Sequence, residues 1–457
     1  MEKALSHNET KSMSFLRALS HNQTKSMPFL QNHSPRSSSN AASIRGSNPF
    51  RISEHIPPDI IIEILTRLPA KSLRRFECVS QSWLSLISSP DFTEGQLRYR
   101  ASVDNKSLLV FSKDSEGYSA KYFSINSLLN EKEATDVVQL DHWPAGFTHE
   151  YVTNLGSCNG LLCIASISQT SFPWILHARN CNFFLWNPSV GKIKILPNLG
   201  TQLNDDCCYV GYGFGYDEVN DDYKVMGIIC SRTAQRTLYV YTTKTGIWRR
   251  TAENFHGDIP WDCSPGAFVN GRLHWALKKR TNGSDVVSFD LATEKFGMLD
   301  GPYHDNSYAY VKIFEASLGM FVDKVEGNSG VCEVWVMKDY GVTDSWTKVF
   351  ALPWNKNTSM LSCSTVFCRL DDGKFCLLLD GVLGLYNTED KSFKNLNDFL
   401  GSAWIVSATP FIESLVMPSA TGIVEMEDNQ KNKGKVFFSA VKDTLVKKLS
   451  NLLDKFK

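Results

Sequence analysis

The sequence predicts a multidomain chain in which a small all-α unit of three helices precedes a large all-β propeller of about six blades, with an amphipathic helix at the C-terminal end. Three patterns in the 457 residues support this prediction. Between residues 51 and 96, apolar residues recur at the spacing of helices. From 107 to 418 they form short alternating or wholly apolar runs separated by Gly, Asn and Asp, which is typical of strands and turns. Within 435–457 the helical spacing returns.

The composition is that of a folded protein rather than a disordered adaptor. Hydrophobic residues make up 42% of the chain and aromatic residues 12%, enough for a large core in two or more domains. The 48 basic residues balance the 48 acidic ones, which argues against a general nucleic-acid binder. No apolar run approaches the roughly 18 residues that span a bilayer, and the N-terminus lacks the apolar stretch of a secretory signal. We therefore expect a cytoplasmic or nuclear protein, or one found in both, whose 12 cysteines are free and mostly buried.

Residues 1–50 contain a direct repeat. The stretch ALSHNETKSMSFL from Ala4 returns as ALSHNQTKSMPFL from Ala18. The Ser, Asn, His and Lys residues of this segment cannot bury enough apolar surface to fold. It is interpreted as a disordered tail with a duplicated unit, or alternatively as a docking peptide in two copies whose combined binding would exceed that of one copy.

The N-terminal helical pattern predicts three short helices. The first is expected to open at the Pro-Pro-Asp sequence of residues 57–59, because proline has a φ near the helical value and an acid suits the positive end of the helix dipole. It is expected to end at Pro69. A second helix is expected from about Lys71 and a third from near Ser80 until Pro90.

These helices carry more apolar surface than they can bury among themselves. Domains of fewer than about 40 residues rarely form a self-sufficient core without disulfides, metals or a partner. Two interpretations remain from the residues alone. Either part of this surface binds another protein, or the helices pack on the rest of their own chain.

The same residues resemble a known family. The segments IPPD, EIL, RLP, KSL-RF, CVS-SW and LISSPDF, in this order from Ile56 to Phe92, are similar to the F-box in its plant form. The resemblance implies that the unit docks on a Skp-type adaptor, which joins it to a cullin-RING ubiquitin ligase. Matched residue by residue, the adaptor-facing set would be Ile56, Pro57, Ile64, Leu65, Leu68, Pro69, Leu73, Val79 and Trp83. Pro58 and Gln81 stand where the family more often has an acidic and a basic residue, and both are expected to face solvent.

A unit repeats through the all-β region: a strand that ends on an aromatic residue, a polar turn and a second strand. It occurs as FFLWNPSVGKIKILP, TLYVYTTKTGIWRRT, VVSFDLATEKFGML, CEVWVMKDYGVTDSWTKVFALP and VLGLYNTEDKSFKNL. The aromatics that mark the register are Trp186, Tyr241, Phe289, Trp335 and Tyr386, at intervals of 55, 48, 46 and 51 residues by subtraction. Kelch-type propeller blades repeat at about 50 residues. A weaker unit around Tyr122 brings the expected number to about six blades, and a late strand within AWIVSATPFIESLV, from Ala403, is expected to pair into the first blade and close the ring.

The tryptophans divide into two groups by their place in the repeat. Those in the repeat frame are expected in the core between blades, and they are Trp186, Trp248, Trp335 and Trp346. Others are expected in connections, where rigid scaffolds carry binding residues. The candidate substrate-binding residues are Trp143, Trp174, Trp261 and Trp354.

The all-β region has a resemblance of its own. The segments CNGLLCI, LWNPSVGKIKILP, GFGYDEVNDDYKV, YTTKTGIWR, GAFVNGRLHWA and SFDLATEKF are similar to the F-box-associated interaction region that follows the F-box in many plant proteins and is related to kelch propellers. This resemblance spans roughly residues 107–415. The kelch double glycine is absent from the sequence, so the resemblance implies a divergent, kelch-like propeller.

The C-terminal part is expected to contain a linker and a helix. Residues 419–434 are acidic and polar, with Glu425, Glu427 and Asp428. Within 435–457 the apolar residues Phe438, Val441, Leu445, Leu449, Leu452 and Phe456 fall on one helix face, and lysines dominate the other. Such a helix packs on its own propeller, pairs with a second copy, lies on a membrane surface or binds an acidic partner. The first two are the preferred interpretations.

No arrangement typical of catalysis occurs in the sequence. The 10 histidines are isolated, and CxxC, GxSxG, P-loop and HExxH motifs are missing. The glycine-rich run 211–215 lies between strands with no helix after it, so a propeller turn is expected rather than a phosphate site. The pairs Asp221-Asp222 and Asp371-Asp372 are interpreted as turn residues rather than metal ligands. No catalytic residue, metal site or cofactor is therefore expected.

Two functions from different classes remain. The first is the substrate-recognition subunit of an SCF-type (Skp–cullin–F-box) ubiquitin ligase, in which the helices bind the adaptor and the propeller binds target proteins for ubiquitination and proteasomal degradation. The second is a propeller enzyme or a carbohydrate-binding lectin. The helical motif from Ile56 separates them, because only the ligase subunit requires an adaptor-docking set of helices.

Overall fold

The computed structural model describes a helical region and a larger region of strands. The described residues are 57–103, 107–113, 117–125, 137–140, 151–167, 176–177, 181–202, 207–231, 236–252, 265–278, 284–302, 308–326, 329–355, 365–370, 373–401, 404–418 and 423–425. The duplication within residues 1–50 and the helix expected in 435–457 lie outside them.

Four helices, not the three expected, occur between residues 57 and 103. They are α2 (Pro58–Thr66), α3 (Ala70–Phe76), α4 (Gln81–Ile87) and α5 (Pro90–Ser102). Pro90 was expected to end the last helix, but it begins α5. The reason is local: Ser89 Oγ accepts a hydrogen bond from the backbone N–H of Phe92 (3.3 Å). Pro90 fills a first-turn position that needs no N–H, and Asp91 places an acid in the same turn.

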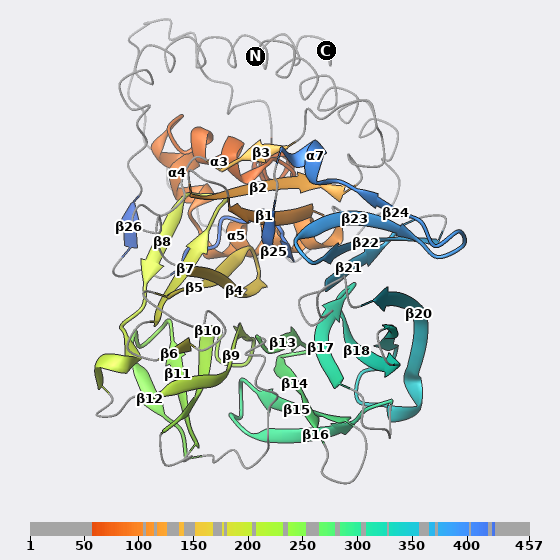
Figure 1. Cartoon of the computed structure of the whole chain (residues 1–457). Coiled ribbons are helices and arrows are strands. Elements are labelled where there is room, and N and C mark those ends of the chain that lie inside the picture. Colours follow the sequence, from red (N-terminus) through yellow and green to blue (C-terminus); the bar gives the residue numbers. More distant parts are fainter. Residues whose placement is uncertain are drawn as a thin grey trace, which may run out of the picture. The chain divides into compact units, whose positions relative to one another are not determined.

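Six antiparallel sheets follow and form the blades of a β-propeller (Figure 1). Blade 1 consists of β25 (Ile405–Pro410), β1 (Ser107–Lys113), β2 (Tyr118–Ser124) and β3 (Val138–Gln139), and blade 2 of β4 (Tyr151–Cys158), β5 (Leu161–Ile167), β7 (Cys181–Asn187), β8 (Lys192–Ile195) and β26 (Ile423–Glu425). Blade 3 consists of β6 (Leu176–His177), β9 (Cys208–Asp217), β10 (Asp222–Cys230), β11 (Arg236–Thr242) and β12 (Trp248–Arg250), and blade 4 of β13 (Ala267–Val269), β14 (Arg272–Lys278), β15 (Ser284–Asp290) and β16 (Phe296–Asp300). Blade 5 consists of β17 (Tyr308–Phe314), β18 (Ser317–Glu326), β19 (Ser329–Met337) and β20 (Trp346–Asn355), and blade 6 of β21 (Thr365–Arg369), β22 (Lys374–Leu379), β23 (Val382–Asn387) and β24 (Phe393–Asn395). Short helical turns occur at η4 (Leu199–Gln202), η5 (Thr343–Ser345) and α7 (Asn397–Leu400).

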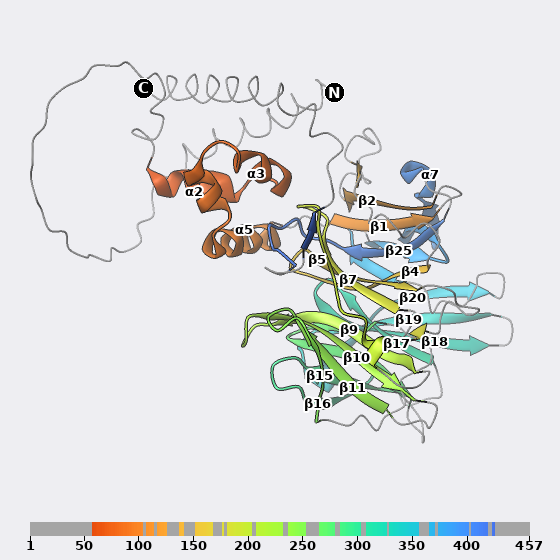
Figure 2. The same cartoon turned by 90° about the vertical axis from the view of Figure 1, so that its left-hand side faces the viewer.

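The ring is closed by a strand from near the C-terminal end, as expected from the sequence. Strand β25 pairs antiparallel with β1, with Leu108 opposite Pro410 and Phe111 opposite Ser407 (Figure 2). The closing strand β25 is the edge strand of the sheet β25-β1-β2-β3, so a strand from near the C-terminal end completes blade 1. This pairing removes the sheet edge that an open propeller would leave.

The repeat detected in the sequence is one hairpin in each of blades 2 to 6, formed by β7–β8, β11–β12, β15–β16, β19–β20 and β23–β24. In blades 2, 4 and 6 the aromatic residue is followed by Asn or Asp, whose side chain fixes the turn. Asn187 Oδ1 accepts a hydrogen bond from the N–H of Ser189 (2.8 Å), and Asp290 Oδ1 accepts one from the N–H of Thr293 (2.8 Å). The expectation of about six blades is confirmed.

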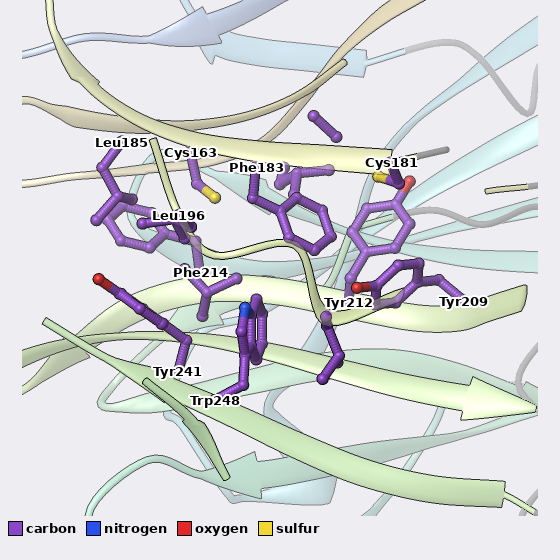
Figure 3. Close-up of a cluster of buried hydrophobic side chains, with 14 of the residues drawn as sticks. Cys163, Cys181, Phe183, Leu185, Leu196, Tyr209, Tyr212, Phe214, Tyr241 and Trp248 are labelled. Carbon is purple, nitrogen blue, oxygen red and sulfur yellow. The ribbon is translucent and has the colours of Figure 1, made fainter. Parts of the chain in front are cut away.

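Aromatic residues of the repeat frame fill the core between neighbouring blades. Figure 3 shows the cluster between blades 2 and 3, where the rings of Phe183 and Tyr209 meet edge-on with centroids 5.1 Å apart. Of the four tryptophans expected in the core, Trp186, Trp248 and Trp346 are buried and Trp335 is half-buried. Their role is therefore to hold blades together.

The glycine-rich run 211–215 lies in strand β9 and not in a turn, which corrects the expectation. A Cβ added to Gly213 would lie 2.8 Å from Leu273 Cδ1, and one added to Gly215 would lie 2.3 Å from Phe268 Cδ2. Both neighbours belong to blade 4. The glycines are thus explained by the close approach of two blades, which leaves no room for a side chain.

The aspartate pair at 221–222 has mixed roles. Asp221 lies in the turn before β10 with φ of 50°, as expected of a turn residue, whereas Asp222 is buried at the start of that strand. Its Oδ1 accepts hydrogen bonds from Thr243 Oγ1 (2.6 Å) and the N–H of Lys244 (3.1 Å). The pair at 371–372 lies outside the described residues.

Part of the expected linker is a strand. Residues 423–425 form β26, which pairs antiparallel with β8, with Val424 opposite Ile193. The prediction of a linker over 419–434 is therefore wrong at this point, because the two β-branched residues before Glu425 extend the outer edge of blade 2.

Candidate functional site

Helix α2 has one face turned into the helical core and one left open. Leu65 is 2% exposed and lies in the core, with Ile61 and Leu68 packed against it. Ile60 and Ile62, on either side of Ile61, are 45% and 37% exposed. An amphipathic helix of this length buries one stripe at the 3.6-residue period. Three consecutive isoleucines exceed what that stripe can hold.

Two residues of the expected adaptor-facing set are core residues instead. Leu65 and Leu73 are 2% and 0% exposed, in a cluster with Ala70, Ile87 and Phe92. A unit this small needs its largest inward side chains to hold its own helices together, so neither is available to a partner. Both assignments are therefore corrected.

The rest of the expected set divides by exposure. Pro57, Pro69 and Val79 are exposed, whereas Ile64, Leu68 and Trp83 are half-buried. The Trp83 ring packs edge-on against Phe76, with centroids 5.5 Å apart. Ile56 lies outside the described residues. Pro58 and Gln81 are exposed, as expected.

Four large apolar side chains of the helical region remain open to solvent, and we call them the exposed apolar set. They are Ile60 (45%), Ile62 (37%), Val79 (40%) and Leu84 (37%). Only Val79 among them belongs to the adaptor-facing set expected from the sequence. The signal for the others was the surplus of apolar residues over the single stripe that each helix can bury.

The charged residues of these helices form pairs within the helices. Arg67 pairs with Glu63 in α2, and Arg74 at the end of α3 pairs with Glu77. Solvent-exposed pairs of this kind add little to stability. Neither pair covers a side chain of the exposed apolar set.

The interpretation that the helices pack on their own chain is correct for the inner face. Leu415 joins the helical core, and Val190 packs against it. Arg100 of α5 lies 3.7 Å from Glu413. The helical unit therefore has one face on its own chain and a second, carrying the exposed apolar set, that the described chain leaves uncovered.

The four candidate substrate-binding tryptophans fall largely outside the part of the chain that the structure describes. Trp143, Trp174 and Trp261 lie outside the described residues. Trp354 lies in strand β20 opposite Gly330, rather than in the connection where it was expected, and its side chain is outside the description. Their role in binding stays a prediction.

Buried charges in the propeller have structural partners. Lys224 Nζ lies 2.8 Å from Asp217 Oδ2 and 3.1 Å from Glu294 Oε1, and it donates a hydrogen bond to the Leu291 carbonyl (2.6 Å). Burial alone would raise the pKa of Asp217, but hydrogen bonds from Lys224 and Asn220 outweigh burial and lower it. Since Lys224 belongs to blade 3 and Leu291 follows β15 of blade 4, this cluster ties two blades together.

His274 is also a structural group. Its Nδ1 lies 3.0 Å from the Ala267 carbonyl and its Nε2 2.8 Å from the Tyr340 hydroxyl. Burial lowers the pKa of His274 to about 4, and the nearby charge of Arg272 acts in the same direction. A carbonyl only accepts, so the neutral ring donates from Nδ1 and accepts from Tyr340 at Nε2.

No group of three metal-ligating side chains occurs among the described residues. The cysteines in that part of the chain are not joined in disulfide bonds. None of the described helices is long and apolar enough to cross a membrane.

Two family models match the chain, and together they cover both regions. The model described as the F-box domain matches residues 54–95, and the one described as the F-box associated beta propeller domain matches residues 106–382. The chain belongs to the F-box proteins with an associated β-propeller. Among its relatives, an F-box/kelch-repeat protein of Arabidopsis thaliana is 30% identical over 74% of this chain and 89% of its own length. F-box protein CPR1 of the same plant is 28% identical over 71% of this chain and 79% of its own length.

The solved structures that this F-box protein is similar to share little of its sequence. The Aleuria aurantia lectin, described as a six-bladed β-propeller, shares 10% identity over 64% of this chain and 94% of its own, with a TM-score of 0.32. The AofleA protein of Arthrobotrys oligospora shares 12% identity over 68% of this chain and 87% of its own, with a TM-score of 0.36.

Proposed function

We propose that this F-box protein is the substrate-recognition subunit of an SCF-type ubiquitin ligase. The helices bind a Skp-type adaptor through the exposed apolar set, and the propeller binds target proteins. The protein itself performs no chemistry. Ubiquitin transfer is accelerated because lysines of the captured target are held at high local concentration near the carrier protein that is loaded with ubiquitin.

One observation supports this proposal above the others: the helical unit already has a complete core and still exposes Ile60, Ile62, Val79 and Leu84. Burying a whole Val, Leu or Ile side chain contributes about 1.5–3 kcal/mol. Four partly exposed ones therefore supply several kcal/mol to a partner that covers them. Membership of the F-box family identifies a Skp-type adaptor as the partner that fits.

The non-catalytic role is supported by what the buried polar groups do. The described charged clusters in the propeller connect strands and blades, as at Lys224 and His274. Each of these groups is held by partners from its own chain, so none is poised as a base or nucleophile facing a substrate.

The adaptor interface is tested by placing charges in the exposed apolar set. Ile60→Glu with Leu84→Glu is expected to weaken binding of a purified Skp-type adaptor at least tenfold, about 1.4 kcal/mol, because a partner would have to bury two carboxylates. Both positions are exposed, so the helices are expected to stay folded. Isothermal titration calorimetry measures the affinity, and circular dichroism checks the fold.

The matched control is Val219→Glu, on the turn between β9 and β10, where the side chain is 80% exposed. It adds a single charge and is expected to leave adaptor binding unchanged. Unaltered affinity in the Ile60/Leu84 variant would refute the proposed interface. In cells, proximity labelling under proteasome inhibition separates the two partner classes, since adaptor components disappear with the Ile60/Leu84 variant and targets remain.

A further inference from the structure

Residues 411–416 link the closed ring to the helical unit, and we call this segment the strap. It follows directly after the closing strand β25. Phe411 is buried in the cluster between blades 1 and 2, and its N–H donates a hydrogen bond to the Ser107 carbonyl (3.0 Å). Neither family model includes the strap, since they match residues 54–95 and 106–382.

Two tight turns of blade 2, at Asn159 and Asn187, hold the strap by hydrogen bonds. Asn187 is fully buried, and its Nδ2 donates hydrogen bonds to the carbonyls of Ser414 (3.0 Å) and Val416 (2.7 Å). In return Ser414 Oγ donates to the Asn159 carbonyl (2.8 Å). The next residue, Gly160, has a φ of +78°, and a Cβ there would lie 2.3 Å from Ser414 Oγ. The turn is thus shaped to admit the strap.

The helical end of the strap enters the core of the helices. Leu415 is buried in the same cluster as Leu65, Leu73 and Phe92. It therefore takes part in a core that otherwise comes entirely from residues 65–92. Loss of this side chain would leave the helical core with a gap on its propeller side.

A polar contact next to Leu415 connects the same two regions. Tyr122 of blade 1 donates a hydrogen bond from its hydroxyl to Glu413 Oε1 (2.8 Å), while Arg100 of α5 lies 3.7 Å from Glu413 Oε2. The Arg100 and Glu413 side chains are 14% and 18% exposed. An ion pair shielded to this degree is screened less by salt than a surface pair. Strap residues thus contact the helices by both apolar and charged groups.

We propose that the strap is the positioning element that holds the helical unit at a fixed place on the propeller, with Leu415 and Asn187 as its two anchors. The only covalent link on the N-terminal side is the short stretch 104–106 between α5 and β1. One covalent connection does not by itself set the orientation of a helical unit on a propeller. Two attachments, one of them inserted in the helical core, fix that orientation.

The consequence for transfer rests on the proposed function. If the adaptor binds the exposed apolar set, the strap sets the span between the ligase and any protein held by the propeller. A fixed distance limits ubiquitin transfer to those lysines of the bound protein that the ligase can reach across it.

The test uses the full chain with two spin labels. Each label is attached to a non-natural azide-bearing residue, one at exposed position 85 in α4 and one at exposed position 298 in β16. Pulsed electron paramagnetic resonance then gives the distribution of distances between the helices and blade 4. The unsubstituted chain is expected to give one narrow distribution. Asn187→Ala removes the blade anchor without touching the helical core, and is expected to broaden the distribution at least twofold.

The matched control is Asn397→Ala. Asn397 is also a buried asparagine that joins two segments, accepting from the N–H of Leu383 (2.9 Å) and donating to the Gly381 carbonyl (2.9 Å), but it begins α7 and bonds to blade 6. Its loss is expected to leave the distribution narrow. A second variant, Leu415→Asp, is expected to broaden it, and the conservative Leu415→Met to restore it. A narrow distribution in folded Asn187→Ala protein would overturn the proposal.

A second readout separates the strap from the proposed function. With a Skp-type adaptor and a cullin-RING ligase, mass spectrometry maps ubiquitin on the chain's own propeller lysines. The unsubstituted chain is expected to be modified at few positions and Asn187→Ala at more, with equal adaptor affinity. Absence of modification in every variant would count against the ligase role, whereas the distance measurement would still decide the strap. Identical site patterns would count against the fixed span.

Discussion

The helical unit and the propeller bury their apolar residues by different means. Each blade shares its core with a neighbour, and aromatics such as Tyr241 and Phe289 are completely covered. The helical unit has a core of five of its own residues plus Leu415. It leaves the exposed apolar set in water. Closure gives every blade a neighbour to pack against, whereas the four helices leave these side chains open beside their own small core.

The largest expected effect is on the stability of the propeller, where the core between two blades is disrupted. Phe289→Ala removes a fully buried ring that packs 5.0 Å from Phe296 and is expected to cost about 3–5 kcal/mol of unfolding free energy. Because the six blades share cores in series, the whole propeller is expected to unfold at a lower temperature. Calorimetry measures the transition, and an unchanged melting temperature would show that blades are stabilised independently.

The next effect concerns the helical unit. Leu65→Ala is expected to destabilise the helices by about 2–5 kcal/mol while leaving the blades intact, because Leu65 lies in the small core. Hydrogen exchange of α2 to α5 against that of β9 and β10 measures the difference. The matched control is Ile62→Ala, three residues away and 37% exposed, for which a much smaller change is expected. Equal effects of the two substitutions would contradict the division of α2 into a core face and an open face.

A pH-dependent effect of similar or smaller size is expected from His274. Its pKa is lowered from 6.5 to about 4 in the folded chain, so the unfolded chain binds the proton more tightly. The contribution of neutral His274 is complete above about pH 6.5 and is lost as the pH falls toward 4, by roughly 3 kcal/mol in all. Urea unfolding of the original chain and of His274→Gln at pH 7, 5.5 and 4.5 gives the difference in unfolding free energy between the two chains. The contributions of the other titrating groups are the same in both chains and cancel in this difference. A difference that does not change with pH would contradict it.

The fold could be predicted from the sequence because its repeat has a physical cause at each position. An aromatic for the shared core recurs in blades 2 to 6, and in blades 2, 4 and 6 an Asn or Asp for the turn follows it, as at Trp186-Asn187 and Phe289-Asp290. The closing strand followed from the same logic. The helical boundaries failed at Pro90, where the same proline-acid signature used correctly at residues 57–59 marked a beginning.

The candidate site was harder to predict because burial depends on partners distant in sequence. Spacing alone gives the stripe on α2 but not which of its residues faces inward, and Leu65 was therefore assigned to the wrong environment. Likewise nothing local in the sequence indicates that Leu415 completes a helical core more than 300 residues earlier in the chain. The glycines of β9 were misassigned for the same reason, since the residues that crowd them belong to another blade.

Closure by β25 has a consequence for biosynthesis. Strand β1 ends at residue 113 and its partner begins at 405, so about 290 residues must be made before they can pair. At about 5–20 residues per second, the ribosome needs about 15–60 s to deliver that partner. For this time the nascent polypeptide carries β1 with one edge unpaired, which other chains can capture, and a chain that ends before residue 405 would keep that open edge. Because β25 is made so late, we expect chaperones to protect the open edge of β1 during translation.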